Sequence, residues 1–362
     1  MKRLGFLGIT GTVSTAYIGQ RALLKMQDHP HFETVAFIAD DPADVGKTLA
    51  EAVEGRWQAD EPLPARYADM IMLAADTEAL RGEDIDIVIS TLFGPLSREL
   101  DPRLAAAGIA VISESTGMRM DKDVPLIVPE INADHLGIIK AQQAARGFDR
   151  GFIVSSPLCT AVLVAMAMKP FADAFGLKSG VVTTMQALSG AGKKGVFSLA
   201  ILDNLLPHIN QEEEKLYGEV PKILGTYADG EIRNHKAALT FTATRVPVRD
   251  GHTLSMSMGF EKPFDLAALP ALVEDYAGPS EVKGLHTAIA KPLKYRPEVD
   301  RPQPLLDRDV DGSMAVSLGR LRDAPGIENG LSLIAVGHNH GRGTYGNAVL
   351  LAELVHGEGL LG

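Results

Sequence analysis

The sequence predicts an α/β protein of two domains. Its 362 residues exceed the roughly 100–200 residues of a typical domain. In the first 150 residues, short apolar runs alternate with helix-like segments, which is typical of a parallel sheet covered by helices. Hydrophobic residues make up 46% of the chain and charged residues 22%, so the chain can build substantial cores.

The N-terminal segment follows the pattern strand, glycine turn, helix, strand. "RLGFLGIT" predicts a buried strand, "GITGTVSTAYIGQRALLKMQ" a tight turn that opens into a helix, and "HFETVAFIAD" a second strand. This is the first unit of a Rossmann-type dinucleotide-binding domain, where backbone N–H groups of the turn and the helix N-terminus hold a pyrophosphate. The candidate cofactor-binding residues of the turn are Gly8, Thr10, Gly11, Thr12 and Val13.

The glycine motif of this turn is incomplete. Ser14 stands where a third glycine is expected, so a strand–turn–helix unit without a ligand stays open as an alternative. "IDIVISTLFG", "GIAVISES" and "VPLIVPEIN" predict further strands of the same sheet. The segment "AVEGRWQADEPLPARYADM" has no clean period and is predicted to be a loop.

Asp40 ends the second predicted strand. A carboxylate at this place accepts hydrogen bonds from ribose hydroxyls and repels a 2′-phosphate, which favours NAD over NADP. The alternative is an ordinary surface turn, because "DDPAD" is rich in turn-forming residues.

Charge and hydropathy exclude several classes of function. The net charge is −11 and there is no long basic run, which argues against nucleic-acid binding. The longest apolar stretch, "LCTAVLVAMAM", is too short to cross a membrane, and no signal-peptide pattern follows the N-terminus. The single cysteine cannot form an internal disulfide, so we expect a cytoplasmic protein with no nucleic-acid or membrane partner.

That cysteine, Cys159, lies where a strand and a turn lead into an apolar helix, "GFIVSSPLCTAVLVAMAMKPFADAF". A helix N-terminus favours a thiolate, and its free N–H groups can hold an oxyanion at an attacked carbonyl. Cys159 is therefore a candidate nucleophile. The alternative is a small buried cysteine that serves packing alone.

Four polar residues follow in segments downstream. "DNLLPHINQEEEKLYGEVPKIL" predicts a helix on which Glu212 and Lys215 share a face, although such a charge run is often only a solvated surface. "TFTATRVPVRDGHTLSMSMGFEKP" predicts two strands around a turn, with Arg245 before the turn and His252 directly after it. An imidazole transfers protons near neutral pH, so His252 is a candidate acid–base group; a structural histidine is the alternative.

Two further histidines stand close together in "GHNHG". His338 and His340, two apart on a strand, would point to the same face and could ligate a metal. Because no cysteine or acidic partner lies nearby in the sequence, no metal site is predicted.

Taken together, eight blocks of this chain resemble those of aspartate-semialdehyde dehydrogenases, more closely the archaeal and fungal type. Archaeal malonyl-CoA reductases look similar as well. The blocks, in order, are "GITGTV", "RMDKDVPLIVPEIN", "SSPLCTA", "TTMQALSGAG", "LLPHINQEEEK", "ATRVPVRDGH", "RPQPLLDRD" and "GRLRDAPG…GHNHGRGTYGNAVLLAEL".

The resemblance implies that aspartyl-4-phosphate is reduced to aspartate semialdehyde with NADPH, through a thioester on Cys159, whereas Asp40 favours NAD. It implies that His252 is the general acid–base and that Gln186 orients the acyl group. Arg245 would pair with the substrate carboxylate and Glu212 with its amino group.

The resemblance further implies that Arg119 and Lys215 bind the phosphate, and that Ser189, Gly190 and Asn339 belong to the cofactor side. It implies a homodimer or homotetramer and a place in the biosynthesis of lysine, threonine and methionine. Residues 1–155 with 340–362 would form the dinucleotide-binding domain, and 156–339 a mixed α+β domain for catalysis and dimerisation.

The chain also departs from the family pattern. The family block asparagine-proline-asparagine-cysteine is Ser156-Pro157-Leu158-Cys159 here, and "NHGRGTYG" places His340 and Tyr345 near the expected nicotinamide side. The loop "ADDPADVGK" stands where small and basic residues usually accompany NADP. Two alternatives therefore stay open: a paralogous acyl-phosphate or acyl-CoA reductase, and a non-catalytic cofactor-binding paralogue in which the cysteine serves packing.

Overall fold

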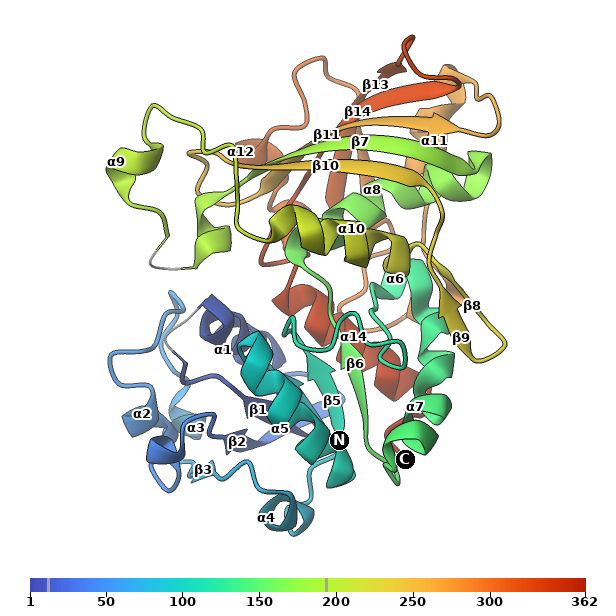
Figure 1. Ribbon diagram of the computed structural model, residues 1–362. Helices are drawn as coiled ribbons and strands as arrows, with labels where there is room; N and C mark the ends of the chain where they lie inside the picture. The colour runs from blue at the N-terminus through green and yellow to red at the C-terminus, as the bar shows by residue number, and fades with distance from the viewer. Residues whose placement is uncertain (12–13, 193–194) are drawn as a thin grey trace.

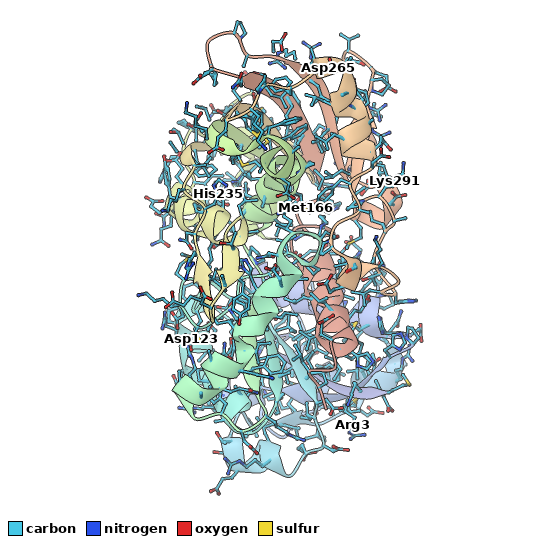
Figure 2. All side chains as sticks on the ribbon, turned by 90° about the vertical axis from the view of Figure 1, so that its right-hand side faces the viewer. Arg3, Asp123, Met166, His235, Asp265 and Lys291 are labelled. Carbon is cyan, nitrogen blue, oxygen red and sulfur yellow. The ribbon has the colours of Figure 1, made fainter. Side chains whose placement is uncertain are left out.

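The computed structural model describes residues 1–11, 14–192 and 195–362, which form two stacked lobes (Figure 1). Each lobe is built on a six-stranded sheet. In the side view of Figure 2, Arg3 lies low in the first lobe and Asp265 at the far end of the second. The predicted fold class is confirmed: a Rossmann-like α/β lobe is joined to a lobe with a mixed sheet.

The first sheet is parallel, with the strand order β3-β2-β1-β4-β5-β6. The order reverses between β1 and β4, and ligands of such sheets bind at this switch point, beyond the carboxyl ends of the strands. The strands are β1 (Lys2–Leu7), β2 (Phe32–Ile38), β3 (Met72–Leu73), β4 (Ile87–Ser90), β5 (Ala110–Ser113) and β6 (Phe152–Ser155).

Helices cover both faces of this sheet, and β4, β5 and β6 are accordingly buried along their whole length. The C-terminal helix α14 packs into the same core as β1 and α1. The helices and 3₁₀ turns of this part are α1 (Ser14–Met26), η1 (Pro42–Asp44), α2 (Leu49–Ala52), α3 (Ala65–Ala68), α4 (Thr77–Arg81), α5 (Gly94–Ala106), α6 (Pro129–Asn132), η2 (Ala133–Ile138), α7 (Ile139–Arg146) and α14 (Tyr345–Gly357).

One predicted strand of this lobe is wrong. In "VPLIVPEIN", Leu126 makes a single bridge to Ser155, and the segment then turns into helix α6. Prolines at 125 and 129 have no N–H group to donate to a ladder, which prevents continuous strand pairing. The apolar run is buried all the same, so its hydrophobicity indicated burial but not the type of element.

The second sheet is mixed, with the order β10-β7-β11-β14-β13-β12. Strand β10 runs parallel to β7, and β11 runs antiparallel to it on the other side. The last residues of β7 and β10 and the first residues of β11 therefore lie at the same end of the sheet. The strands are β7 (Leu177–Gln186), β10 (Ala238–Arg245), β11 (His252–Phe260), β12 (Leu293–Arg296), β13 (Val316–Asp323) and β14 (Gly330–Gly337).

Two helices, α8 (Cys159–Phe175) and α10 (Glu212–Ile223), pack against this sheet and contribute to its core (Figure 1). Alternate residues are exposed in the first part of β10 and exposed or half-buried in β7, with Val181 at 53% exposure. The other elements are η3 (Leu188–Ala191), α9 (Ser198–Ile201), the hairpin β8 (Thr226–Ala228) and β9 (Glu231–Arg233), η4 (Leu266–Ala268), α11 (Leu269–Glu274), η5 (Ser280–Val282), α12 (Pro304–Asp307) and α13 (Val310–Ser313). Within the described ranges, none of the helices has the length and apolar character needed to cross a bilayer.

Candidate active site

Cys159 is the first residue of α8, as the sequence predicts. The first hydrogen bond along this helix runs from the Val162 N–H to the Leu158 carbonyl at 3.0 Å. The N–H groups of residues 159–161 therefore have no acceptor within the helix and carry its partial positive charge. This is the local geometry in which an oxyanion beside the sulfur is stabilised.

His252 lies directly against the sulfur. Its Nε2 is 3.4 Å from Cys159 Sγ, and its Nδ1 accepts the Ala187 N–H at 3.0 Å. Because Nδ1 accepts a hydrogen bond, the proton of the neutral ring is on Nε2 and points toward the sulfur. The ring is fully buried, which fixes this orientation.

Both groups are neutral in the free protein. Burial raises the pKa of the Cys159 thiol to about 12, and the nearby Glu212 carboxylate adds to the shift. Burial also lowers the pKa of His252 well below its usual value, and the charge of Arg245 acts in the same direction. A raised thiol pKa and a lowered imidazole pKa both disfavour a thiolate–imidazolium pair in the protein without substrate.

Gln186 and Glu212 are hydrogen-bonded to each other close to the start of α8. The Glu212 Oε1 atom accepts hydrogen bonds from Gln186 Nε2 and from Thr160 Oγ1, both at 3.1 Å. Thr160 directly follows the cysteine, so this carboxylate is anchored to the start of α8. Glu212 is itself the first residue of α10, where a negative charge stabilises the helix.

Arg245 is the last residue of β10 and is paired with Gln186, the last residue of β7. It is buried, and its Nη1 atom donates to the Ala187 carbonyl at 2.7 Å. A Cβ atom at Gly190 would lie only 2.8 Å from this nitrogen and 3.3 Å from His252 Cε1. Gly190 therefore allows the 188–191 turn to close over both side chains.

The two predicted phosphate ligands differ in their settings. Arg119, in the loop after β5, is buried and donates from Nη1 to Glu219 Oε1 at 3.1 Å and from Nη2 to the Glu114 carbonyl at 2.9 Å. Lys215 lies one turn along α10 from Glu212 and is half-buried. Among the described residues, its ammonium has no hydrogen bond or ion pair.

The predicted dinucleotide turn follows β1. Gly8 has a φ of 86°, and a Cβ atom there would lie 2.9 Å from the Thr91 carbonyl oxygen, so this position requires glycine. Thr10 Oγ1 donates to Asp40 Oδ1 at 2.8 Å, and a Cβ atom at Gly11 would lie 3.6 Å from Asp40 Oδ2. The Asp40 carboxylate thus lies beside the glycine turn. Thr12 and Val13 lie outside the described residues.

Of the predicted cofactor residues of the second lobe, Ser189 lines a cleft of about 500 Å³ between the lobes. Asn339 donates to Ser189 Oγ at 2.9 Å and accepts the Gly251 N–H at 2.9 Å. The cleft is lined by side chains of both lobes, among them Tyr17, Asp60, Ser189, Arg249, Asp250 and His340. A glycine turn at the switch point and a cleft between the lobes suit an extended dinucleotide.

Two family models match this chain. "Semialdehyde dehydrogenase, NAD binding domain" matches residues 3–139, and "Semialdehyde dehydrogenase, dimerisation domain" matches residues 168–340. This chain belongs to the semialdehyde dehydrogenase family. It is thereby an oxidoreductase acting on an aldehyde or acyl group with NAD(P), and it carries the dimerisation domain of that family.

Individual members of the family resemble the chain over nearly its full length. A curated aspartate-semialdehyde dehydrogenase of Methanothermobacter thermautotrophicus is 39% identical over 98% of this chain and 99% of the relative. The Saccharomyces cerevisiae enzyme of the same name is 34% identical over 99% of both chains. The crystal structure of aspartate-semialdehyde dehydrogenase with NADP from Candida albicans superposes with a TM-score of 0.87, at 32% identity over 99% of both chains.

Three residues near the site of this semialdehyde dehydrogenase were not predicted from the sequence. Glu219 joins Arg119 to the backbone before the nucleophile. Glu114 is buried beside Arg119. At Gly343, a Cβ atom would lie 2.8 Å from Cys159 Cβ, so glycine allows the loop before α14 to pack behind the nucleophile. Glu219 could have been found, because it follows Glu212 by seven residues and so shares its helix face.

The histidines of "GHNHG" are held by backbone contacts. His338 Nδ1 accepts the N–H groups of His340 and Gly341 at 3.1 and 3.2 Å. His340 Nε2 lies 3.2 Å from the Ser189 carbonyl, and its ring meets Tyr17 edge-on at 4.9 Å. No cluster of three or more metal-ligating side chains occurs in the part of the chain that the structure describes.

Proposed function

We propose that this protein is an aspartate-semialdehyde dehydrogenase, which reduces aspartyl-4-phosphate to aspartate semialdehyde and releases phosphate. One observation carries the proposal: Cys159 and His252 are in contact, and Gln186, Glu212 and Arg245 surround them. A zwitterionic acyl group needs one anion and one cation for its ends, and Glu212 and Arg245 supply these charges beside the sulfur.

In the first step, the Cys159 sulfur attacks the acyl carbon, the carbon–oxygen bond to phosphate breaks, and a thioester forms while the thiol proton leaves with the phosphate. The free N–H groups at the start of α8 stabilise the tetrahedral oxyanion. We propose that Arg119 and Lys215 neutralise the leaving phosphate. Support comes from Arg119 Nε, which is buried without a partner among the described residues, and from the unpaired ammonium of Lys215.

A reduced dinucleotide, when bound, would supply a hydride to the thioester carbon. As the carbon–sulfur bond breaks, His252 Nε2–H donates its proton to the sulfur and Nε2 is reprotonated from solvent, which releases the semialdehyde and restores the cysteine as a thiol. Gln186 orients the acyl oxygen through an amide that its contacts with Glu212 and Thr184 hold in place.

We also propose that the cofactor is NAD rather than NADP. Asp40 lies beside the glycine turn, where its carboxylate accepts from Thr10 and would repel a 2′-phosphate. In the same turn, Gly8, Thr10, Gly11, Thr12 and Val13 would hold the pyrophosphate, and Ser189, Gly190 and Asn339 would contact the nicotinamide end.

For the assembly, we propose a homodimer formed through the second lobe. The exposed residues of β7 and β10 offer a sheet face for a second copy, and the region belongs to the dimerisation domain of the family. We further propose a division of the chain into residues 1–155 with 340–362 and residues 156–339. Support comes from α14, which packs in one core with β1 and α1, and from α8, which packs in the core of the second sheet.

The test is a cofactor-linked assay of the reverse reaction. It compares aspartate semialdehyde plus phosphate with malonate semialdehyde plus CoA, each with NAD and with NADP. We expect turnover with aspartate semialdehyde, phosphate and NAD. Turnover only with malonate semialdehyde and CoA would assign the chain to the acyl-CoA reductases, and no turnover in any arm would indicate a non-catalytic paralogue.

A further inference from the structure

Glu219 connects two parts of the active site that come from different segments of the chain. We propose that it is a positioning residue, which fixes the guanidinium of Arg119 relative to the nucleophile Cys159. The inference rests on the proposed function in one respect: Arg119 is taken as a ligand of the phosphate.

Each oxygen of the Glu219 carboxylate serves one partner. Oε2 accepts the N–H of Leu158, the residue before Cys159, at 2.6 Å, and Oε1 accepts Arg119 Nη1 at 3.1 Å. Glu219 and Arg119 are 2% and 5% exposed, so water does not compete for these bonds. Charge-assisted bonds of buried groups are the strong class of hydrogen bond, and they hold both partners in one geometry.

The helix α10 provides a common frame for this arrangement. Glu212, Lys215, Glu219 and Lys222 follow at spacings of three, four and three residues, which places them on one helix face. The buried Lys222 ammonium donates to the carbonyls of Arg119, Asp121 and Val124 at 2.7, 2.8 and 2.7 Å. One face of one helix therefore holds the acyl-binding carboxylate at its start and the Arg119 loop at its end.

The hydrogen bonds of Arg119 leave one of its N–H donors available for a ligand. Nη1 and Nη2 donate to Glu219 and to the Glu114 carbonyl, while Nε has no partner among the described residues. The two bonds fix the plane of the guanidinium and leave an N–H for an oxyanion. Because Leu158 is bonded to the same carboxylate, a shift of Arg119 is transmitted to the turn that carries the sulfur.

The variant Glu219→Gln separates the two contacts with a minimal change of shape. An amide has an oxygen at only one of the two positions, so either Leu158 or Arg119 would face its NH2 group, which cannot accept. Glu219→Asp keeps the charge but is too short to reach both, and it serves if the glutamine variant does not fold. The matched control is Glu213→Gln: Glu213 lies on the same helix and accepts the Ala243 N–H at 2.9 Å, away from the sulfur.

Two measurements test the proposal. The first is the KM for inorganic phosphate in the reverse reaction, in the wild type, Glu219→Gln, Arg119→Ala and the double variant. The second is the rate at which iodoacetamide alkylates Cys159 at pH 9, which needs no further engineering because the chain has a single cysteine.

We expect Glu219→Gln to raise the phosphate KM at least tenfold and to change the alkylation rate at least threefold, while Glu213→Gln changes neither. In the Arg119→Ala background, Glu219→Gln should add no more than a twofold rise in KM, because it acts through Arg119. Multiplicative KM effects, or equal effects of the Glu213 control, would overturn the proposal. If the wild type does not turn over aspartate semialdehyde, the proposed function fails by itself; an alkylation rate unchanged in Glu219→Gln would still refute the link.

Discussion

The acyl-binding end and the cofactor-binding end of this site are built in different ways. Around Cys159, side chains touch one another directly: His252 contacts the sulfur, and Glu212 joins Gln186 to the start of α8. At the cofactor end, the contribution comes mainly from backbone conformation, as at Gly8, and from one carboxylate, Asp40, beside the turn.

This difference in construction predicts that side-chain substitutions will have different effects at the two ends of the site. A network of buried, mutually bonded side chains loses its function when one member is removed, because its partners are left unpaired. A backbone cradle tolerates side-chain changes, so one residue at its rim can alter which dinucleotide binds without loss of the chemistry. The following predictions test this contrast, beginning with the largest effect.

Replacement of the nucleophile should have the largest effect. Cys159→Ala removes the only group that can form the thioester, so we expect turnover to fall by at least about 10⁴-fold. The acyl-enzyme, detected by mass spectrometry of the intact protein, should be absent, while dinucleotide affinity measured by calorimetry stays within about twofold. Substantial residual turnover would refute covalent catalysis at this residue. It would also contradict the view that the acyl-binding end depends on a network of mutually bonded side chains.

Loss of the imidazole should rank second. His252→Asn should lower kcat by about 10²–10⁴-fold, the usual contribution of a general acid–base, and leave the dissociation constant of the cofactor nearly unchanged. The exposed His208 provides the control, and His208→Asn should alter neither quantity. Equal losses of turnover and of cofactor affinity would make His252 a structural residue of the whole cleft.

A substitution at the cofactor-binding end should change which dinucleotide is used rather than abolish turnover. Asp40→Ser removes the charge that would repel a 2′-phosphate, so the ratio of kcat/KM for NADP to that for NAD should rise about 10–100-fold. Asp41→Ser removes an equal charge one residue later, at the cap of η1, and should leave the ratio within threefold. A wild-type protein that strongly prefers NADPH would contradict the assigned role of Asp40.

The smallest effect concerns stability and its dependence on pH. Burial raises the pKa of Glu114 to about 7, and the neighbouring Glu219 carboxylate adds to the shift. Since the unfolded carboxyl ionises first, Glu114 destabilises the fold progressively as the pH rises from about 4.5 through 7. The gain in unfolding free energy from Glu114→Gln should therefore be about 2 kcal/mol larger at pH 8 than at pH 5.

Urea unfolding of both proteins at the two pH values measures this difference. Glu99→Gln is a suitable control, because Glu99 is exposed on α5 and forms an ion pair with Arg103, one turn away. A gain for Glu114→Gln that is the same at pH 5 and pH 8 would show that the carboxyl is not the titrating group.

The sequence was sufficient to predict the elements that carry the chemistry. Periodicity indicated the strand–turn–helix units around Gly8 and Cys159, and the turn between Arg245 and His252, because each is a local property of the chain. The strand predicted at 124–132 failed because a buried apolar run has the same composition in a strand and in a loop that contains proline.

What the sequence could not predict is which distant residues meet. The arrangement β10-β7-β11 brings Gln186, Arg245 and His252 to one edge, and this depends on strand pairing over long separations. Likewise, the contact of Glu219 with Leu158 joins residues 61 positions apart. Helix periodicity indicates the face on which such a residue lies, but not what the face packs against.

The raised pKa of the Cys159 thiol has a consequence for chemical inhibition. With a thiol pKa of about 12, the free protein contains very little thiolate near neutral pH, so simple thiol-directed electrophiles and mild oxidants should react slowly with it. An inhibitor would gain selectivity by combining a modest electrophile with groups that engage the substrate-binding charges of Glu212 and Arg245, because those contacts would hold the electrophile beside the sulfur and offset its slow reaction.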